Sequence, residues 1–183
     1  IVLVSGHHNL IEGNTFGPSA HQSIDIQNIG QVHHNIIRNN LFQNFWHTNM
    51  GIASYTIYNY PFVKDHLIEN NIVIDAGETW HCDQTKNGAT EPRMCPDGRA
   101  VHASIVLNTF NSIVRKNIFI NNGKLIAGDN NNQYRNRFYQ NTFNRNYIGV
   151  QYGGTQGEFF KNNIFYNQRT YELYMPDNGN PDN

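Results

Sequence analysis

A short motif of the form N-x-I-x-x-N-x-F recurs along this chain and limits the folds that the chain can adopt. Its clearest copy is NIIRNNLF at residues 35–42. Aligning the copies on the second asparagine gives a series of anchor positions: Asn14, Asn40, Asn71, Asn117, Asn141 and Asn163. The later anchors follow one another with a period in the low twenties, and the longer spacings leave room for insertions. A repeat of this period predicts a β-solenoid in which each copy forms one coil.

Fixed offsets from the anchor have a constant chemical character. The third residue before it is apolar in every copy, and the second residue after it is aromatic in all copies but one. Alternate residues of a strand face opposite sides, so both columns are predicted to point into the core. The second residue before the anchor is polar or amphipathic and is predicted to face water; this column is Glu12, Arg38, Glu69, Arg115, Tyr139 and Lys161.

Each coil is predicted to contain three short strands: one before the anchor, one after it, and one about ten residues later. The anchor itself should lie at a bend, because asparagine tolerates the left-handed backbone conformation. Its amide can also donate and accept hydrogen bonds between stacked coils. Two insertions interrupt the pattern, an aromatic loop at 55–62 and a longer loop at 78–99. Both flank the third strand of their coil and are predicted to wall a groove across that sheet.

Length and charge narrow the possible partners. The 183 residues predict one solenoid domain at 1–175 with a loop inserted at 78–99, followed by a polar tail at 176–183. A formal net charge of −1 gives no basic surface for nucleic acid. No apolar run approaches the roughly 20 residues of a membrane span. Because the chain opens on Ile1 rather than Met, it reads as a mature product or a piece of something longer.

Both cysteines, Cys82 and Cys95, lie in the longer insertion. A disulfide between them would stabilise the fold by roughly 3 kcal/mol, mainly by restricting the unfolded chain. Disulfides persist in oxidising compartments, so we expect an extracellular or periplasmic protein. The alternative is a pair of reduced, unrelated thiols, since nothing nearby resembles a four-ligand zinc set.

The layout resembles the right-handed parallel β-helix of the pectate-lyase-like superfamily, and within it the extracellular repeat proteins with N-x-I-x-x-N-x-F coils. The resemblance spans residues 2–174. It implies an all-β, single-stranded parallel β-helix of about six to seven coils. It also implies that a polysaccharide is bound or cleaved on the sheet formed by the third strands. Pectate lyases of that superfamily bind calcium through clustered acids, and pectin hydrolases use clustered aspartates.

The third strands of this chain carry few acids. Asp25 lies near their centre and Glu172 lies far from it. Neither a hydrolytic carboxylate pair nor a calcium cluster is visible, so no metal or cofactor is predicted and calcium is unsupported. Histidines precede three of the strands and could take up a proton. The predicted catalytic set is His21, Asp25, His47, His102 and Arg99. The alternative is that these histidines cap strand ends.

Aromatic and basic residues in and near the two insertions form the predicted substrate-binding set: Trp46, Tyr55, Tyr58, Trp80, His81 and Arg93. Flat aromatic rings stack on sugar faces. The alternative is that these rings cover the hydrophobic core. The remaining histidines of the amino-terminal half precede second-sheet strands and are predicted to be turn residues: His7, His8, His33, His34 and His66. They lie outside the predicted groove.

Two functions follow from these observations. The first is a secreted β-helix protein that binds or depolymerises an extracellular polysaccharide, with lyase-type β-elimination as the reaction. The alternative is a non-catalytic rod, such as a fibre, stalk or adhesin segment. Neither end of the chain carries the amphipathic helix that normally blocks a solenoid, which favours association with a further β-helix chain, end to end or side by side.

Overall fold

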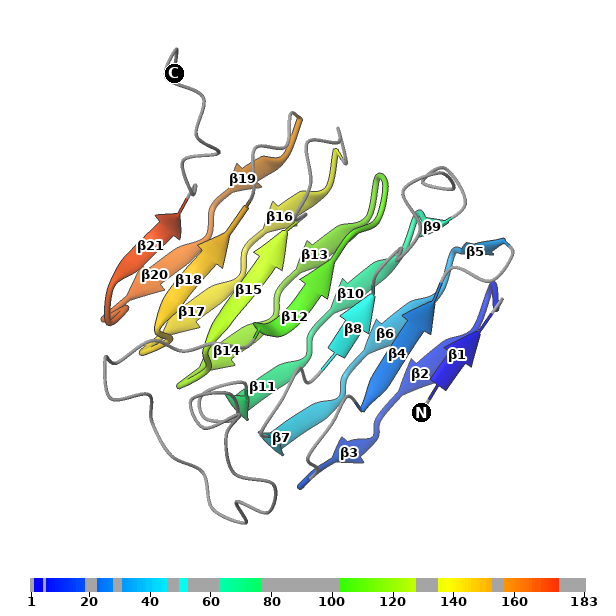
Figure 1. Ribbon diagram of the computed structural model, residues 1–183, viewed down its shortest axis with the longest axis horizontal. Helices are drawn as coiled ribbons and strands as arrows, with labels where there is room; N and C mark the ends of the chain where they lie inside the picture. The colour runs from blue at the N-terminus through cyan, green and yellow to red at the C-terminus, as the bar shows by residue number, and fades with distance from the viewer. Residues whose placement is uncertain are drawn as a thin grey trace, which may run out of the picture.

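The computed structural model describes residues 2–4, 6–18, 23–27, 31–45, 50–52, 63–76, 103–127, 135–152 and 157–174. These residues form a parallel β-helix-like solenoid of about six coils, built from strands and turns without a helix. The coils stack along the long axis of the molecule, from the blue amino-terminal end to the red carboxy-terminal end (Figure 1). The all-β solenoid expected from the repeat is therefore confirmed.

Three parallel sheets run the length of the stack. Sheet A contains β1 (Val2–Val4), β4 (Ile24–Gln27), β8 (Met50–Ile52), β12 (Ala103–Leu107), β15 (Lys124–Ala127), β18 (Ile148–Gln151) and β21 (Tyr171–Tyr174). Sheet B contains β2 (Leu10–Glu12), β6 (Ile36–Arg38), β10 (Leu67–Glu69), β13 (Ile113–Arg115), β16 (Arg137–Tyr139) and β19 (Phe159–Lys161). Sheet C contains β3 (Thr15–Phe16), β7 (Leu41–Phe45), β11 (Ile72–Ala76), β14 (Ile118–Ile120), β17 (Thr142–Asn144) and β20 (Ile164–Tyr166).

Each coil contributes one strand to each sheet, as the repeat predicts, with the anchor asparagine between its sheet B and sheet C strands. Two coils add a fourth short strand that the repeat does not predict. These are β5 (Val32–His33) and β9 (Val63–Lys64), which pair in parallel. Each lies just before the sheet B strand of its coil.

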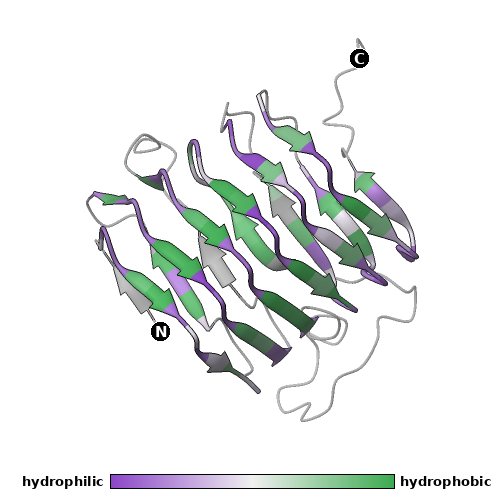
Figure 2. Ribbon diagram, turned by 180° about the vertical axis from the view of Figure 1, so that it is seen from behind, coloured by the Kyte–Doolittle hydropathy of each residue, from purple (hydrophilic) through white to green (hydrophobic). Residues whose placement is uncertain are grey.

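The two apolar columns form the core, as predicted. Side chains at the third position before the anchor are fully buried in the central coils, as at Ile37, Ile68 and Phe138. The column after the anchor stacks its rings, with centroids 4.8 Å apart for Phe16 and Phe42 and 4.9 Å apart for Phe119 and Phe143. Val73 separates these two stacks, because it pairs with Phe42 on one side and Phe119 on the other. Apolar residues follow the strands and polar ones gather at the bends (Figure 2).

Most bends of the coils share one construction, in which a residue with positive φ is followed directly by a residue whose side chain bonds to the neighbouring coil. The bend at Asp75 departs from it, because the next residue is Ala76, whose backbone N–H donates to Oδ1 of Asn122. The bend between sheets B and C has its positive φ at Gly13, Asn39, Asn70, Lys116, Gln140 and Asn162. The left-handed residue thus precedes the anchor, and the expectation that the anchor itself adopts this conformation is wrong. The anchor serves instead as the hydrogen-bonding residue.

The anchor asparagines form a continuous buried ladder. The backbone N–H and Nδ2 of Asn40 both donate to Oδ1 of Asn71, each at 3.0 Å. Asn71 in turn donates from Nδ2 to the Ile37 carbonyl at 2.9 Å and to Oδ1 of Asn117 at 3.0 Å. The same pattern continues through Asn141 to Asn163. Each buried amide is thereby satisfied by the coils on either side.

A second ladder lies at the bend that precedes sheet B, here called the first bend, and its members are chemically mixed. They are Asn9, Asn35, His66, Ser112, Asn136 and Glu158. The Asn35 N–H donates to Nδ1 of His66 at 3.3 Å, and the His66 N–H donates to the Ser112 hydroxyl at 3.1 Å. His66 is therefore a turn residue, as predicted, and its ring lies inside the fold.

The charged column of sheet B alternates in sign as the sequence indicates, but one member departs from the predicted exposure. Arg38 pairs with Glu12 at 2.9 Å and Arg115 pairs with Glu69 at 2.7 Å. Glu69 is only 8% exposed, so the prediction that the whole column faces water is wrong at this position. Glu69 lies between Arg38 and Arg115 in register, and the apolar stems of long basic side chains shield such a neighbour from water.

Within the described residues, no helix has the length and apolar character needed to cross a membrane.

Candidate functional site

Most residues of the predicted polysaccharide site lie outside the described residues. Asp25 is described, on β4. The other predicted catalytic residues, His21, His47, His102 and Arg99, are outside the described ranges. So is the predicted binding set of Trp46, Tyr55, Tyr58, Trp80, His81 and Arg93, together with the predicted disulfide between Cys82 and Cys95. Their roles stay predictions.

Asp25 projects from the outer face of sheet A. Its neighbours Ile24 and Ile26 are fully buried, so the alternation of the strand turns the Asp25 side chain outward, where it is half-buried. The neighbouring coils place Val2 and Gly51 at the same register position. Among the described residues of sheet A, the other acid is Glu172 on β21, with four strands between β21 and β4. The described part of the sheet therefore pairs Asp25 with no second carboxylate.

A groove lies instead on the outer face of sheet B, where it bends into sheet C. The cavity measures about 520 Å³ and spans β13, β16 and β19, which are neighbours in the stack (Figure 1). Its lining is Arg115, Lys116, Tyr139, Gln140, Phe159, Lys161 and Asn162. We call it the sheet B groove. Three of these residues, Lys116, Gln140 and Asn162, are the left-handed residues of their bends, which places their side chains on the rim.

The sheet B groove combines aromatic rings with positive charge. The rings of Tyr139 and Phe159 lie 5.8 Å apart at an interplanar angle of 67°, and Phe159 is 50% exposed. Three of the lining side chains are cationic, and none is acidic. Arg115 also forms a salt bridge with Glu69 of the preceding coil, and this contact orients its guanidinium group. The arrangement offers an apolar platform beside several donors for an anionic ligand.

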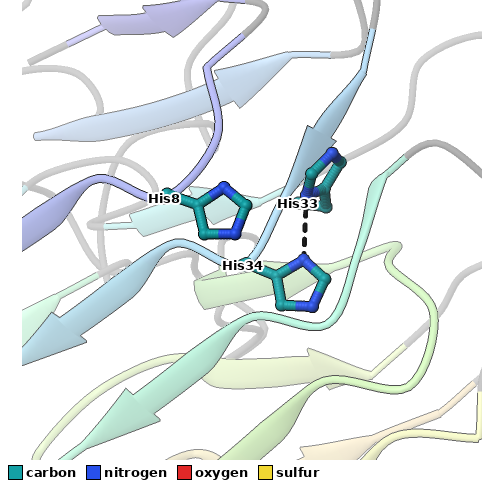
Figure 3. A group of neighbouring side chains, drawn as sticks. All are labelled: His8, His33 and His34. Atoms are coloured by element: carbon teal, nitrogen blue, oxygen red, sulfur yellow. Dashed lines mark hydrogen bonds between the residues drawn. The ribbon is translucent and has the colours of Figure 1, made fainter.

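Four histidines form a second cluster at the first bend of the two amino-terminal coils. Nδ1 of His7 lies 2.9 Å from Nδ1 of His8, and Nδ1 of His33 lies 2.8 Å from Nδ1 of His34. The pairs stack across the coils, with centroids 4.9 Å apart for His7 and His33 and 5.1 Å apart for His8 and His34. Figure 3 shows His8 and His34 as parallel rings, with His33 bonded to His34.

One ring of this histidine cluster, that of His33, lies where positive charge is disfavoured. Burial lowers the pKa of His33, and the neighbouring His34 lowers it further. His7, His8 and Lys64 act in the same direction. His33 is half-buried, while His7, His8 and His34 are exposed. The His33 imidazole is therefore biased towards the neutral form, in which a ring nitrogen carries a free lone pair.

Sequence reasoning missed both surfaces. It assigned the four histidines to turns, which the positive φ confirms for His8 and His34, whereas His33 ends strand β5, so the turn assignment is wrong there. It did not anticipate the contact between the four rings. The sequence contains a pattern that indicates this contact: each His-His pair ends six residues before an anchor asparagine, at Asn14 and at Asn40, so the two pairs occupy the same position in adjacent coils. The sheet B groove had a comparable signal in Lys116, Gln140 and Asn162, which all directly precede an anchor.

Comparison of the chain with protein-family models, with curated proteins and with solved structures finds no match.

Proposed function

We propose that this chain is an extracellular β-helix protein of the pectate-lyase-like type that binds an anionic polysaccharide in the sheet B groove. The observation that carries the proposal is the combination, in one groove, of the Tyr139 and Phe159 rings with three cationic side chains. Aromatic rings pack against the apolar faces of sugars, and Arg and Lys form charge-assisted hydrogen bonds with carboxylates. A net charge of −1 for the whole chain means that the positive character is local.

The distribution of the groups favours a polymer of uronate residues over a single sugar. Arg115 and Lys116 belong to one coil, and Lys161 lies two coils further along the stack. Adjacent coils are about 4.8 Å apart, so these cations are spaced along the groove rather than gathered at one point. The side-chain amides of Gln140 and Asn162 lie between and beside them and suit sugar hydroxyls.

A binding experiment with matched variants tests this function. The wild type should bind polygalacturonate or alginate and bind dextran much less, with an affinity that falls as salt is added. Lys116→Gln with Lys161→Gln should weaken uronate binding by about tenfold or more. Phe159→Ala should weaken it to a similar degree, because it removes half of the aromatic platform. Arg145→Asn is the control, since it removes an exposed cation at a bend outside the groove.

Unchanged affinity in the lysine and phenylalanine variants would contradict the assignment to this groove. Equal binding of dextran and polygalacturonate would contradict the anionic preference. Circular dichroism of each variant would verify that the fold is retained, as expected for exposed Lys116 and Lys161.

Lyase-type β-elimination is the reaction that we propose should the chain cleave its ligand. A base takes the proton α to the uronate carboxyl, a double bond forms between the α and β carbons, and the bond from the β carbon to the glycosidic oxygen breaks. The leaving oxygen takes up a proton, and the other product is an unsaturated sugar. The candidate bases His21, His47 and His102 lie outside the described residues and precede strands of sheet A, so this reaction is proposed for the site predicted on sheet A and is separate from binding in the sheet B groove. Growth of ultraviolet absorbance during incubation with uronate polymers measures this reaction separately from binding.

A structural rod is the second candidate, and the continuity of the asparagine ladder favours it. The ladder runs unbroken from Asn14 to Asn163 and satisfies buried amides in every coil. A fibre or stalk segment needs this regularity and no ligand. Failure to bind any polymer of a broad polysaccharide panel would favour the rod.

A further inference from the structure

The histidine cluster at the first bend has the geometry of a ligand set. His8, His33 and His34 each offer a ring nitrogen, and these three nitrogens all lie within 4.8 Å of one another. His33 ends β5, His34 follows it directly, and His8 comes from the preceding coil (Figure 3). Residues from two coils are therefore brought together by the stacking of the solenoid.

The backbone holds these three residues in place. The His8 N–H donates to the His33 carbonyl at 3.2 Å, and the His34 N–H donates to the Lys64 carbonyl at 3.2 Å. His8 and His34 both have a left-handed backbone, with φ of 56° and 54°. Their Cβ atoms are thus fixed by the same bend construction that repeats throughout the molecule, and only the exposed rings must adjust on binding.

The bend itself does not require histidine. The same left-handed position is occupied in later coils by Asp65, Asn111, Arg135 and Gly157. The position before it, held by His7 and His33 in the first two coils, is Lys64 and Phe110 in the next two. Two adjacent coils nevertheless carry histidine at both positions. Folding of this bend therefore does not explain why histidine occupies all four positions.

The imidazole nitrogens determine which metal ions this site can bind. Two imidazole nitrogens bound to one zinc ion lie at most about 4 Å apart, because each bond is about 2.0–2.1 Å long. The nitrogens already lie within 4.8 Å of one another, and small rotations of the exposed His8 and His34 rings would bring them to this separation. Imidazole suits zinc, copper and nickel, whereas magnesium and calcium prefer oxygen ligands. His7 lies against His8 at 2.9 Å and is placed to orient that ring.

We infer that His8, His33 and His34 bind one divalent late first-row transition-metal ion, such as zinc, at the first bend of the amino-terminal coils. The coil next to the site carries one positive and one negative side chain, Lys64 and Asp65. Lys64 follows His33 in the stack, and Asp65 follows His34. Oδ1 of Asp65 accepts a hydrogen bond from Asn111 of the following coil at 2.7 Å, so the Asp65 carboxylate is engaged on the side away from the cluster. The inference is independent of polysaccharide binding in the sheet B groove.

Zinc chloride added to the chain without a polyhistidine tag provides the test. Equilibrium dialysis followed by metal analysis should give one ion per chain at this site. Imidazole C–H resonances of His8, His33 and His34 should shift together during the titration. The double variant His8→Asn, His34→Asn should weaken binding more than about a hundredfold, since loss of a mere supporting residue costs 10–100-fold. Asparagine is chosen because it tolerates the left-handed backbone of both positions.

Two control variants separate the site from general effects. His66→Asn removes a buried histidine of the next coil and should leave zinc affinity within a few-fold of the wild type. Arg145→Asn changes a left-handed position at another bend and should do the same. Calcium at the same concentration should not displace zinc.

Three results would overturn the inference. The first is zinc affinity that is the same in the wild type and the His8→Asn, His34→Asn variant. The second is binding seen only at millimolar zinc, and the third is a titration that shifts none of the three histidines. A circular dichroism spectrum of the double variant that matches the wild type shows that lost binding reflects lost ligands rather than lost fold.

Discussion

At the scale of single residues, the bends explain why this chain is rich in asparagine. Most bends combine one residue that accepts a left-handed backbone with, directly after it, one whose side chain bonds between coils. Asparagine performs both tasks, as Asn39 and Asn40 do side by side. Other residues fill one role alone, such as Lys116 for the backbone and Ser112 for the bond.

His66 is the residue at which this rule couples folding to pH. Its ring is 1% exposed at a ladder position, and burial lowers its pKa from 6.5 to about 4. The unfolded chain thus takes up this proton below about pH 6.5, whereas the folded chain takes it up only below about pH 4. The contribution of neutral His66 to the free energy of unfolding is complete above about pH 6.5. It is lost as the pH falls from about 6.5 to about 4. The loss is on the order of 3 kcal/mol.

His66→Asn is the matched variant, because asparagine occupies the same ladder position at Asn9, Asn35 and Asn136. We expect the variant to lose less stability than the wild type between pH 7 and pH 4, by about the same 3 kcal/mol. Urea unfolding at several pH values measures the difference. Parallel pH profiles for the two proteins would show that His66 does not carry the effect.

At the scale of elements, the sequence predicted what depends on local alternation. The buried columns through Ile37 and Phe42 follow from strand geometry, and so does the pairing of Arg38 with Glu12. The burial of Glu69 was not predictable in this way, because it depends on the side chains of the coils on both sides. The short β5 and β9 strands also lack a repeating pattern that would have identified them.

The candidate sites were harder to predict than the sheets for the same reason. The histidine cluster joins His8 to His34, and the sheet B groove joins Lys116 to Lys161, across different coils. Contacts of this kind depend on the register of whole coils, which insertions of unequal length obscure in the sequence. The predicted catalytic residues share a different difficulty, since only Asp25 lies within the described residues.

The asparagine ladder yields an element-scale prediction. Asn71→Ala removes the acceptor for the Asn40 N–H and the donor to the Ile37 carbonyl, both buried. Each unsatisfied buried group costs about 1–3 kcal/mol, so the free energy of unfolding should fall by roughly 3 kcal/mol or more. Asn14→Ala is the control, because Asn14 is exposed at the edge of the ladder and should cost about 1 kcal/mol or less. Equal costs, measured by denaturant unfolding, would contradict a burial-dependent ladder.

At the scale of the whole molecule, the solenoid is a one-dimensional stack in which the described strands of each coil pair with those of the adjacent coils in the sheet order. The stability of such a stack is a sum of coil and interface contributions. Central coils have two interfaces each and bury their core side chains fully, as at Ile68, Val114 and Phe138. The same inward-facing columns are less well covered in the outermost coils: Ile11 is 7% exposed, and Phe16, Phe160 and Phe165 are only partly buried.

Hydrogen exchange should therefore report a gradient along the stack. Amides of β10 and β13 in sheet B should exchange most slowly, because their opening requires separation from coils on both sides. Amides of β19 and β20 in the last coil should exchange earlier, through local opening that leaves the central coils intact. Exchange measured by mass spectrometry at neutral pH resolves these segments. Uniform protection from β10 to β20 would instead indicate that the stack opens as one cooperative unit, and that the interfaces between coils are strong enough to suppress opening at the ends.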